Sequence, residues 1–237
     1  MKKLFSRLLN KKKHKPTAPA DYDGLSRQEA FSKVYRDRIW SRTTPDESPF
    51  HSGEGSRNPE VTGPYVAAIS GFLQEFGSGK SVADIGCGDF EIGRQLVPFA
   101  TRYMAFDIVP ELIEHHRANE TADHLSFDVL DLVEDPLPPA DIILVRQVLQ
   151  HLSNDDVLSF VRKFPGSCQH LIVTEHLPAD ENFVPNLEHD SGPGIRLSVN
   201  SGVDLSAAPF NLQASSKRIL CDVLAYDGRI RTTLYSF

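Results

Sequence analysis

One segment constrains the fold more than any other: an apolar run that carries a single acid and ends in two closely spaced glycines. Residues 81–90 read Ser-Val-Ala-Asp-Ile-Gly-Cys-Gly-Asp-Phe, and a helix-like pattern follows from Phe90 to Val97. A strand that turns at glycines into a helix lets backbone N–H groups approach a ligand closely. The segment therefore predicts a ligand-binding strand–turn–helix unit.

A second acid lies at the matching point of the next predicted strand. The apolar run 103–106 ends in Asp107, 19 residues after Gly88, and Ile108 follows. An acid at the tip of the second strand is placed to accept hydrogen bonds from ribose hydroxyls. Together the two segments predict a site for a cofactor that contains a nucleoside.

The glycine turn departs from the dinucleotide fingerprint G-x-G-x-x-G. Glu91 stands where the third glycine is required, and Gly93 comes two residues late. Asp84 lies inside the first strand, where it would repel a pyrophosphate but suits a positively charged ligand. S-adenosylmethionine carries an ammonium and a sulfonium and no phosphate. A nicotinamide-dependent oxidoreductase is the less favoured alternative.

The segment Asp84-Ile-Gly-Cys-Gly88 resembles motif I of class I S-adenosylmethionine-dependent methyltransferases. In that family a third strand ends in an acid and an apolar residue that bracket the adenine, and residues 127–129 (Phe-Asp-Val) fit. Residues 142–147 and 148–153 look like motif IV and the segment after it in small-molecule and glycan methyltransferases. The resemblance covers roughly residues 50–175, and it implies S-adenosylmethionine as the cofactor.

The resemblance also implies roles for residues at the strand ends. Asp84 would lie near the methionine end of the cofactor, Asp107 would take the ribose hydroxyls, and Asp128 with Val129 would take the adenine. Arg146 is open to three interpretations: it contacts the cofactor, it binds an acidic group of the acceptor, or it pairs with Glu175 or Asp84. The complete predicted cofactor set is Asp84, Gly86, Cys87, Gly88, Asp107, Ile108, Asp128, Val129 and Arg146.

A hydroxyl acceptor needs a base near neutral pH, and an unperturbed histidine titrates near 6.5. His151 follows the fourth strand and is the candidate catalytic base. Two alternatives stay open: a helix-end histidine bonded to backbone, or Glu175 with His176 as the acid/base pair. No metal is expected, because His151, Glu175, His176 and His189 have no i,i+4 or C-x-x-C spacing.

Alternating strand and helix patterns predict a parallel sheet with right-handed crossovers. The expected strands are 81–86, 102–107, 125–129, 141–147 and 170–175; the expected helices are 26–40, 64–76, 90–98, 110–119 and 154–163, with a capping box at Ser26–Glu29. Two further strands, 218–226 and 230–237, flank the turn signal Asp227-Gly228. The predicted fold is α/β: a Rossmann-like, doubly wound, seven-stranded sheet, mostly parallel with a C-terminal antiparallel hairpin strand.

The predicted organisation is a basic flexible tail and linker over 1–20, followed by a single methyltransferase domain over 21–237. Within that domain, 21–63 form an N-terminal cap and 177–215 an irregular insertion. A loop of that length is functional or disordered, and this one leaves the carboxyl edge of the sheet. It is therefore predicted to bind the acceptor, with Arg196, Asn200 and Phe210 as candidate lining residues.

A narrower resemblance concerns the acceptor. Ser52-Gly-Glu-Gly-Ser56, with residues 146–153 and Pro209-Phe-Asn211, is similar to a group of bacterial methyltransferases found among sugar and cell-surface polysaccharide genes. It implies a small-molecule or glycan acceptor. A methyltransferase fold that binds or regulates without catalysis stays open as the second alternative.

Charge is distributed unevenly along the chain. Residues 1–15 carry seven Lys or Arg and no acid, so the net charge of -7 leaves -14 for the remainder (-7 - 7). A body this acidic is a poor nucleic-acid binder. The tail is open to two interpretations, a solvated leader or a weak peripheral contact with an anionic membrane through Leu4, Phe5, Leu8 and Leu9.

The cysteines and the apolar runs indicate where in the cell the protein is located. Cys87, Cys168 and Cys221 form neither a metal-type spacing nor an even set, which favours a reducing cytoplasm. No run of about 18 apolar residues occurs, so no membrane-spanning segment is expected. The expected location is the cytoplasm, with the inner face of the membrane as an alternative, and the sequence does not indicate an oligomeric state.

Overall fold

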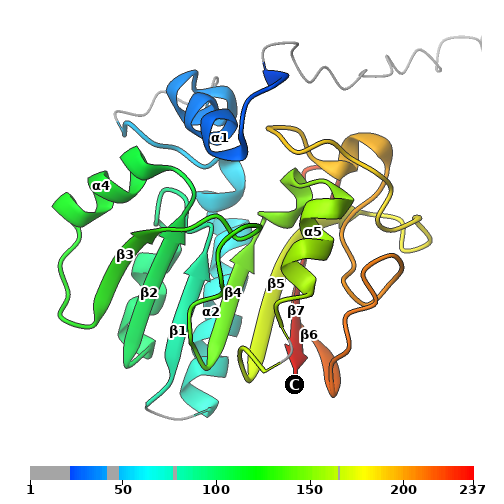
Figure 1. The fold of residues 1–237 in the computed structure, drawn as a ribbon. Helices are drawn as coiled ribbons and strands as arrows, with labels where there is room; N and C mark the ends of the chain where they lie inside the picture. The colour runs from blue at the N-terminus through cyan, green and yellow to red at the C-terminus, as the bar shows by residue number, and fades with distance from the viewer. Residues whose placement is uncertain (1–21, 42–47, 77–78, 165) are drawn as a thin grey trace, which may run out of the picture.

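A computed structural model describes residues 22–41, 48–76, 79–164 and 166–237. Its centre is a seven-stranded sheet in the order β3-β2-β1-β4-β5-β7-β6, shown in Figure 1. Strands β1 to β5 are parallel, whereas β7 runs antiparallel to β5 and to β6. The predicted fold class is confirmed. The strands are β1 Ser81–Ile85, β2 Arg102–Asp107, β3 Leu125–Val129, β4 Ile142–Arg146, β5 His170–Pro178, β6 Ser216–Ala225 and β7 Gly228–Ser236.

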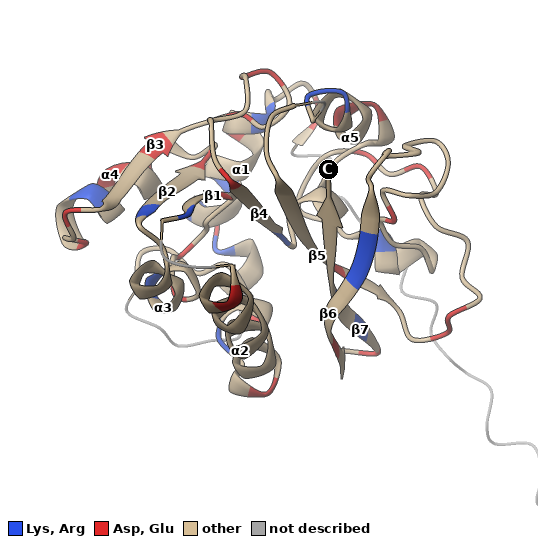
Figure 2. Ribbon diagram, turned by 90° about the horizontal axis from the view of Figure 1, so that it is seen from below, with Lys and Arg blue, Asp and Glu red and all other residues tan. Residues whose placement is uncertain are grey.

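Helices cover both faces of the sheet. On one face lie α2 (Pro59–Glu75), α3 (Gly93–Leu96) and α4 (Pro110–Asn119), which share a core with Val82 and Leu144. On the other lies α5 (Asn154–Val161), which packs with Ala83 and residues 203–212 of the insertion. Figure 2 shows α2 and α3 on one side of the sheet and α5 on the other. Burial on both faces explains why the central strands are almost continuously apolar.

The N-terminal cap lies over the carboxyl ends of the parallel strands, where Figure 1 shows α1 (Arg27–Arg36). The predicted capping box is present, because the Ser26 side chain accepts from the Glu29 N–H and Glu29 bonds back to Ser26. The predicted helix ends early at Arg38, which has a φ of 52°, and a short 3-10 helix, η2 (Ile39–Ser41), follows.

Helix α2 begins at Pro59 rather than at the predicted Pro64. The Asn58 side chain accepts the Glu60 N–H at 3.0 Å, and Pro59 occupies the first turn, where a missing N–H costs nothing. A single 3-10 turn, η3 (Glu54–Ser56), precedes it. The cap therefore reaches the sheet through a short loop, and Pro64 lies inside the helix.

The predicted helix over 90–98 was wrong in extent. Only α3 and the 3-10 turn η4 (Val97–Phe99) form there. Phe90 has a φ of 60°, which is incompatible with a helix, and Pro98 lacks the N–H that an α-helix would need.

The turn between β6 and β7 is shifted by one residue from the predicted Asp227-Gly228. Tyr226 and Asp227 occupy the loop with φ values of 52° and 61°, as a type I′ turn requires, and Gly228 pairs with Ala225. A Cβ on Gly228 would lie 2.5 Å from the Leu177 carbonyl oxygen. The glycine is therefore needed where β7 approaches β5.

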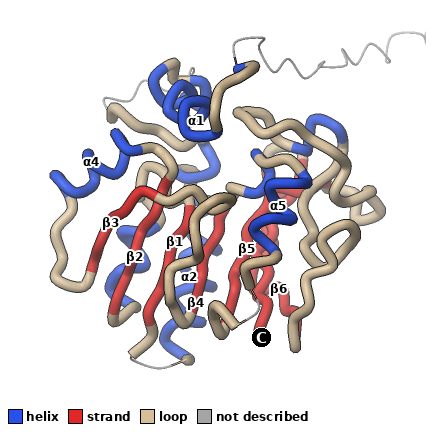
Figure 3. The backbone as a smooth tube through the Cα atoms, viewed as in Figure 1, coloured by secondary structure: helices blue, strands red, loops and turns tan. Residues whose placement is uncertain are grey.

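Residues 179–215 connect β5 to β6 and are largely irregular, with one 3-10 turn, η6 (Arg196–Val199), as Figure 3 shows. Val203, Leu205 and Phe210 of this connection join the core beside α5. Within the described ranges, no helix is long and apolar enough to span a bilayer. The basic segment 1–15 lies outside the described residues.

Candidate functional site

A cavity of about 160 Å³ lies at the carboxyl edge of β1, β2 and β4 beneath the cap. Switch points of this kind are where open α/β sheets bind ligands. Eight of the predicted site residues line it: Asp84, Gly86, Cys87, Gly88, Asp107, Ile108, Arg146 and His151.

The glycine turn is held in an uncommon backbone conformation. Gly86 and Gly88 have φ values of 78° and 55°, and a Cβ on them would lie 2.3 Å from Val148 and 2.4 Å from Ser52. The Gly88 N–H donates to Asp107, and the His116 Nε2–H donates to the Gly88 carbonyl at 2.7 Å. The turn is therefore braced on both sides, and it can present its backbone to a ligand.

Asp107 ends β2 and is itself bound by the backbone. Its Oδ2 accepts from the Gly88 N–H and its Oδ1 from the Val109 N–H, both at 3.1 Å. Burial raises the pKa of this carboxyl to about 6, despite these hydrogen bonds. At neutral pH it is mostly ionised and each oxygen keeps a further lone pair.

Asp84 and Arg146 place opposite charges in one part of the cavity. Burial raises the pKa of Asp84 to about 6, against the opposing effects of a 2.8 Å hydrogen bond from the Tyr103 hydroxyl and of the Arg146 charge. The Arg146 Nη2 donates to the Gly55 carbonyl at 2.7 Å, and its guanidinium carbon lies 5.0 Å from the Tyr65 ring centre.

Arg146 retains unused binding capacity. Its Nε is buried without a hydrogen-bond partner, and in the described part of the chain it forms no ion pair with Asp84 or Glu175. The predicted pairing is therefore not found. A buried guanidinium with an unpaired N–H fits an anionic ligand group.

Asp128 and Val129 do not line the cavity, and their adenine contact stays a prediction. Asp128 forms an ion pair with Arg117 at 2.6 Å, with 61% of its side chain exposed, and Val129 is 44% exposed. Residues 130–132 line the cavity instead. Among them, Asp131 accepts from Arg27 at 2.9 Å and from the Val133 N–H at 2.8 Å. Strand β3 ends at Val129, before the chain reaches the cavity. Asp131, the second acid of residues 128–131, was the sequence signal that could have identified the residue that lines the cavity.

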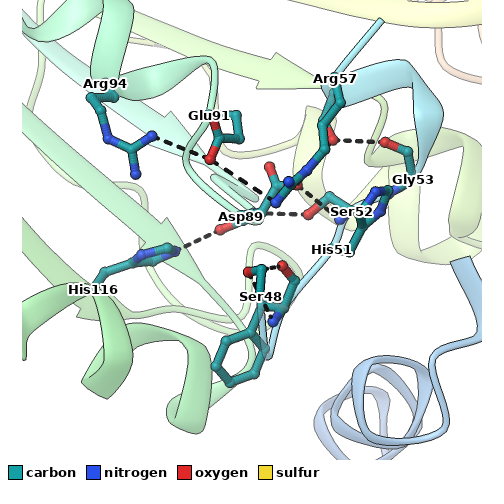
Figure 4. Close-up of polar contacts among 12 residues, drawn as sticks. Ser48, His51, Ser52, Gly53, Arg57, Asp89, Glu91, Arg94 and His116 are labelled. Atoms are coloured by element: carbon teal, nitrogen blue, oxygen red, sulfur yellow. Dashed lines mark hydrogen bonds and ion pairs between the residues drawn. The ribbon is translucent and has the colours of Figure 1, made fainter. Parts of the chain in front are cut away.

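Asp89 connects the glycine turn to the cap and was not predicted. Its Oδ2 accepts from the Ser52 N–H, the Ser56 hydroxyl and the Arg57 Nε at 3.0–3.1 Å, while its own N–H donates to the Ser52 Oγ at 2.8 Å. Figure 4 shows Ser52 and Arg57 beside Asp89. The Tyr35 hydroxyl shares the Ser52 Oγ at 2.9 Å. The segment Ser52–Ser56, singled out for its resemblance, is thus the contact between cap and turn.

We expect Asp89→Ala to lower the free energy of unfolding by about 2–4 kcal/mol, because it leaves several buried donors without their charged acceptor. Urea denaturation measures the loss. The control is Glu91→Ala: Glu91 is 39% exposed on its side chain and meets Arg57 and Arg94 only in surface ion pairs, so its removal should cost less than about 1 kcal/mol. Equal losses in both variants would contradict the interpretation that Asp89 holds the cap to the glycine turn.

His151 ends the 3-10 turn η5 (Leu149–His151) and is 9% exposed. Its Nδ1 donates to the Gly194 carbonyl at 2.8 Å, so the lone pair is on Nε2, which lies 3.3 Å from the Gln150 amide nitrogen. Its ring centre lies 5.0 Å from that of Trp40. Burial lowers the pKa of His151 to about 4, so the ring is neutral at pH 7.

The alternative acid/base pair, Glu175 with His176, lies outside the cavity. The Glu175 Oε1 accepts the Leu149 N–H at 3.1 Å, and the His176 Nε2 donates to the Ala225 carbonyl at 3.2 Å. Neither residue lines the cavity. Among the described residues, no group of three His, Cys, Asp or Glu side chains is arranged to hold a metal ion.

The three predicted acceptor-binding residues lie elsewhere. Arg196 is fully buried, Phe210 belongs to the core beside α5, and Asn200 is exposed with a φ of 54°. None lines the cavity, so the structure adds no support to this prediction. The cap supplies the wall instead, through three aromatic side chains: Phe31, Tyr35 and Trp40. The insertion approaches the cavity at residues 192–194, where the Pro193 carbonyl accepts from the Trp40 Nε1 at 3.3 Å.

Comparison with known proteins agrees with this architecture. Residues 83–165 match the family model described as methyltransferase domain. No curated protein matches the chain. The N-methyltransferase NodS of Bradyrhizobium japonicum WM9, solved with S-adenosyl-L-homocysteine, is similar at 15% identity and a TM-score of 0.59, over 84% of this chain and 97% of that one.

Two further solved structures share the fold. Magnesium protoporphyrin IX methyltransferase (ChlM) of Synechocystis PCC 6803 is similar at 11% identity and a TM-score of 0.56, over 90% of this chain and 100% of that one. The bifunctional kinase-methyltransferase WbdD is similar at 18% identity and a TM-score of 0.53, over 76% of this chain and 40% of that one.

The strand order and the cavity at the glycine turn are those of a Rossmann-like α/β protein. Residues 83–165 form a methyltransferase domain, and the chain has the fold of class I S-adenosylmethionine-dependent methyltransferases. S-adenosylmethionine is its cofactor.

Proposed function

We propose that this enzyme methylates a hydroxyl group of a small molecule or of a cell-surface glycan precursor. The observation that carries the proposal is His151: a neutral histidine on the cavity wall, with Nδ1 tied to the Gly194 carbonyl and the lone pair on Nε2. A hydroxyl acceptor must lose a proton as it is methylated, and a fixed neutral imidazole is suited to take it.

The cofactor supplies a methyl group on a sulfonium, which is already activated for transfer. The protein then has to align the acceptor, exclude water and accept one proton. Phe31, Tyr35 and Trp40 offer aromatic faces for a sugar or other ring, and the polar atoms of Tyr35 and Trp40 are already bonded within the protein. The His151 Nε2 would take the hydroxyl proton.

Charge complementarity supports the assignment of the cofactor's ends. Asp84 and Arg146 provide one anion and one cation in the same buried region, which suits the ammonium and carboxylate of the methionine end. Asp107 keeps acceptor capacity for the ribose hydroxyls, and Asp131, at the other side of the turn, is suited to the adenine amine. The two glycines allow the ligand to approach the backbone closely.

We expect Asp107→Ala to weaken S-adenosyl-L-homocysteine binding by about 1–3 kcal/mol, the cost of losing a charge-assisted acceptor. Isothermal titration calorimetry measures the affinity. Asp128→Ala is the matched control, since that carboxyl is exposed and off the cavity, and its affinity should stay within about twofold of the wild type. Unchanged binding in Asp107→Ala would show that the ribose is held elsewhere.

The acceptor class is tested by turnover with free sugars, sugar nucleotides, lipid-linked glycans and matched amines, followed by mass spectrometry of the product. The proposal requires a methyl ether on a hydroxyl acceptor. Methylation of amines alone would overturn O-methylation while leaving the enzyme class intact.

A further inference from the structure

We infer that Arg196, which does not line the cavity, is a positioning residue that sets the tautomer and orientation of the His151 ring through the carbonyl of Gly194. The inference rests on the proposed role of His151 and goes beyond it, because it assigns a function to a residue outside the cavity.

Arg196 joins the insertion to the turn that carries His151. It is fully buried, and its guanidinium donates to the carbonyls of Leu187, in the insertion, and Leu152, the residue after His151. One rigid, planar group therefore holds the insertion against the turn that carries the candidate base.

The insertion follows that turn at further points. The Gly192 N–H donates to the His151 carbonyl at 2.9 Å, and the Ser153 N–H donates to the Ser191 Oγ at 2.8 Å. Two residues beyond Gly192, the Gly194 carbonyl accepts from the His151 Nδ1 at 2.8 Å. The last contact decides the chemistry, because an Nδ1–H bonded to a carbonyl leaves the lone pair on Nε2, which accepts from the Gln150 amide at 3.3 Å.

The electrostatics of Arg196 favour a positioning role over simple charge pairing. Among the described residues it forms no ion pair within 4.0 Å, and its Nε is buried without a partner. Burial lowers the pKa of Arg196, and Glu175 is the acid that most offsets this effect. A buried guanidinium bonded only to carbonyls is expensive to retain for stability alone.

Glu175 supports the same turn from the sheet side. Its Oε1 accepts the Leu149 N–H at 3.1 Å, at the start of the turn that ends in His151. The cap lies on the remaining side of the His151 ring, where the centre of the Trp40 ring is 5.0 Å from the centre of the imidazole. The ring of His151 is thus enclosed by the sheet, the cap and the insertion, and the insertion alone supplies its Nδ1 acceptor.

The test combines nitrogen-15 NMR of histidine-labelled full-length protein with kinetics, in Arg196→Met, Arg196→Lys and the control Arg229→Met. Arg229 pairs with Glu181 beside the β6–β7 hairpin, away from the cavity. The wild-type and control His151 should show one neutral Nδ1–H tautomer. Arg196→Met should show mixed tautomers, with turnover reduced about 10–100-fold and cofactor affinity within about twofold. Arg196→Lys should restore part of both signals.

A single Nδ1–H tautomer with normal turnover in a folded Arg196→Met protein would overturn the inference. Where Arg196→Met does not fold, Arg196→Lys and Ser191→Ala carry the same test, because both loosen the insertion at the same turn; unchanged tautomers in these two would also overturn it. The nitrogen shifts do not depend on the reaction. A fully active His151→Ala enzyme would therefore refute the proposed base, while the shifts would still decide whether Arg196 positions the ring.

Discussion

His151→Ala is expected to lower turnover by roughly 10²–10⁴, the usual contribution of a general base, and to leave cofactor affinity nearly unchanged. The reason is that the His151 Nε2 carries the basic lone pair on the cavity wall, whereas the predicted cofactor residues that line the cavity lie at the ends of β1, β2 and β4. Steady-state kinetics with an identified acceptor, together with calorimetry, separates the two effects.

The pH dependence gives the same hypothesis a second readout. Burial lowers the pKa of His151 to about 4, and only the neutral ring accepts a proton. The neutral fraction is nearly complete from pH 5 upward and falls as the pH drops through about 4. The rate should therefore be flat from pH 7 to about pH 5, and should not decline near the ordinary histidine value of 6.5.

Two controls restrict the interpretation. His170→Ala changes a histidine at the first residue of β5, at the opposite edge of the sheet, and should retain wild-type turnover. His176→Ala tests the alternative pair with Glu175. A large loss in His176→Ala and none in His151→Ala would move the base to that pair.

The sheet was predictable from sequence because its strands are buried on both faces. Runs such as residues 142–145 are continuously apolar and bounded by polar residues, which is typical of strands in a parallel sheet covered on both faces. The helix over 90–98 was not predictable by periodicity. Its apolar spacing is real, but the backbone at Phe90 turns to a positive φ to close the glycine turn.

The cavity was predictable where its residues follow strands directly. Asp84, Asp107 and Arg146 each lie at or within one residue of a strand end, so sheet topology alone brings them together. Asp128 lies off the cavity because the chain runs on for two further residues before it meets the cavity at Leu130.

The contacts that the cap and the insertion make around the cavity could not be predicted from the sequence. Nothing local in Phe31 or Trp40 distinguishes a cavity wall from an ordinary core residue, since that difference depends on where α1 is docked. Arg196 was chosen as an acceptor ligand because it is a cation in a loop. Its actual partners, the carbonyls of Leu152 and Leu187, follow only from the path of that loop.

Glu175→Gln is expected to make the protein more stable at alkaline pH and to leave its stability at pH 5 about unchanged. Burial raises the pKa of Glu175 from 4.5 to about 8. The folded state therefore keeps this proton more tightly than the unfolded state does. The stability that this provides is complete below about pH 4.5 and is lost as the pH rises through about 8. A shift of this size corresponds to about 3–5 kcal/mol.

Between pH 6.5 and 8, the change in the free energy of unfolding comes mainly from Glu175 and not from the other buried groups. Asp84 and Asp107 have pKa values near 6, so their effect on the free energy of unfolding changes mainly below pH 6.5. The pKa values of the buried histidines are lowered, so their effect also changes mainly below pH 6.5. The wild type should therefore lose about 2 kcal/mol of unfolding free energy across these 1.5 pH units. The exposed Glu181, whose pKa is lowered, provides the control in Glu181→Gln.

Urea denaturation at half-unit steps of pH measures the slope directly. In Glu175→Gln the slope should nearly vanish, because the amide has no proton to lose and its oxygen still accepts the Leu149 N–H. A wild-type profile as flat as that of the variant would show that Glu175 is ionised throughout the window, and that Arg196 has a buried counter-charge after all. A sloped profile means that Arg196 carries its charge beside a neutral carboxyl, and this explains why its guanidinium bonds to main-chain carbonyls at the turn of His151.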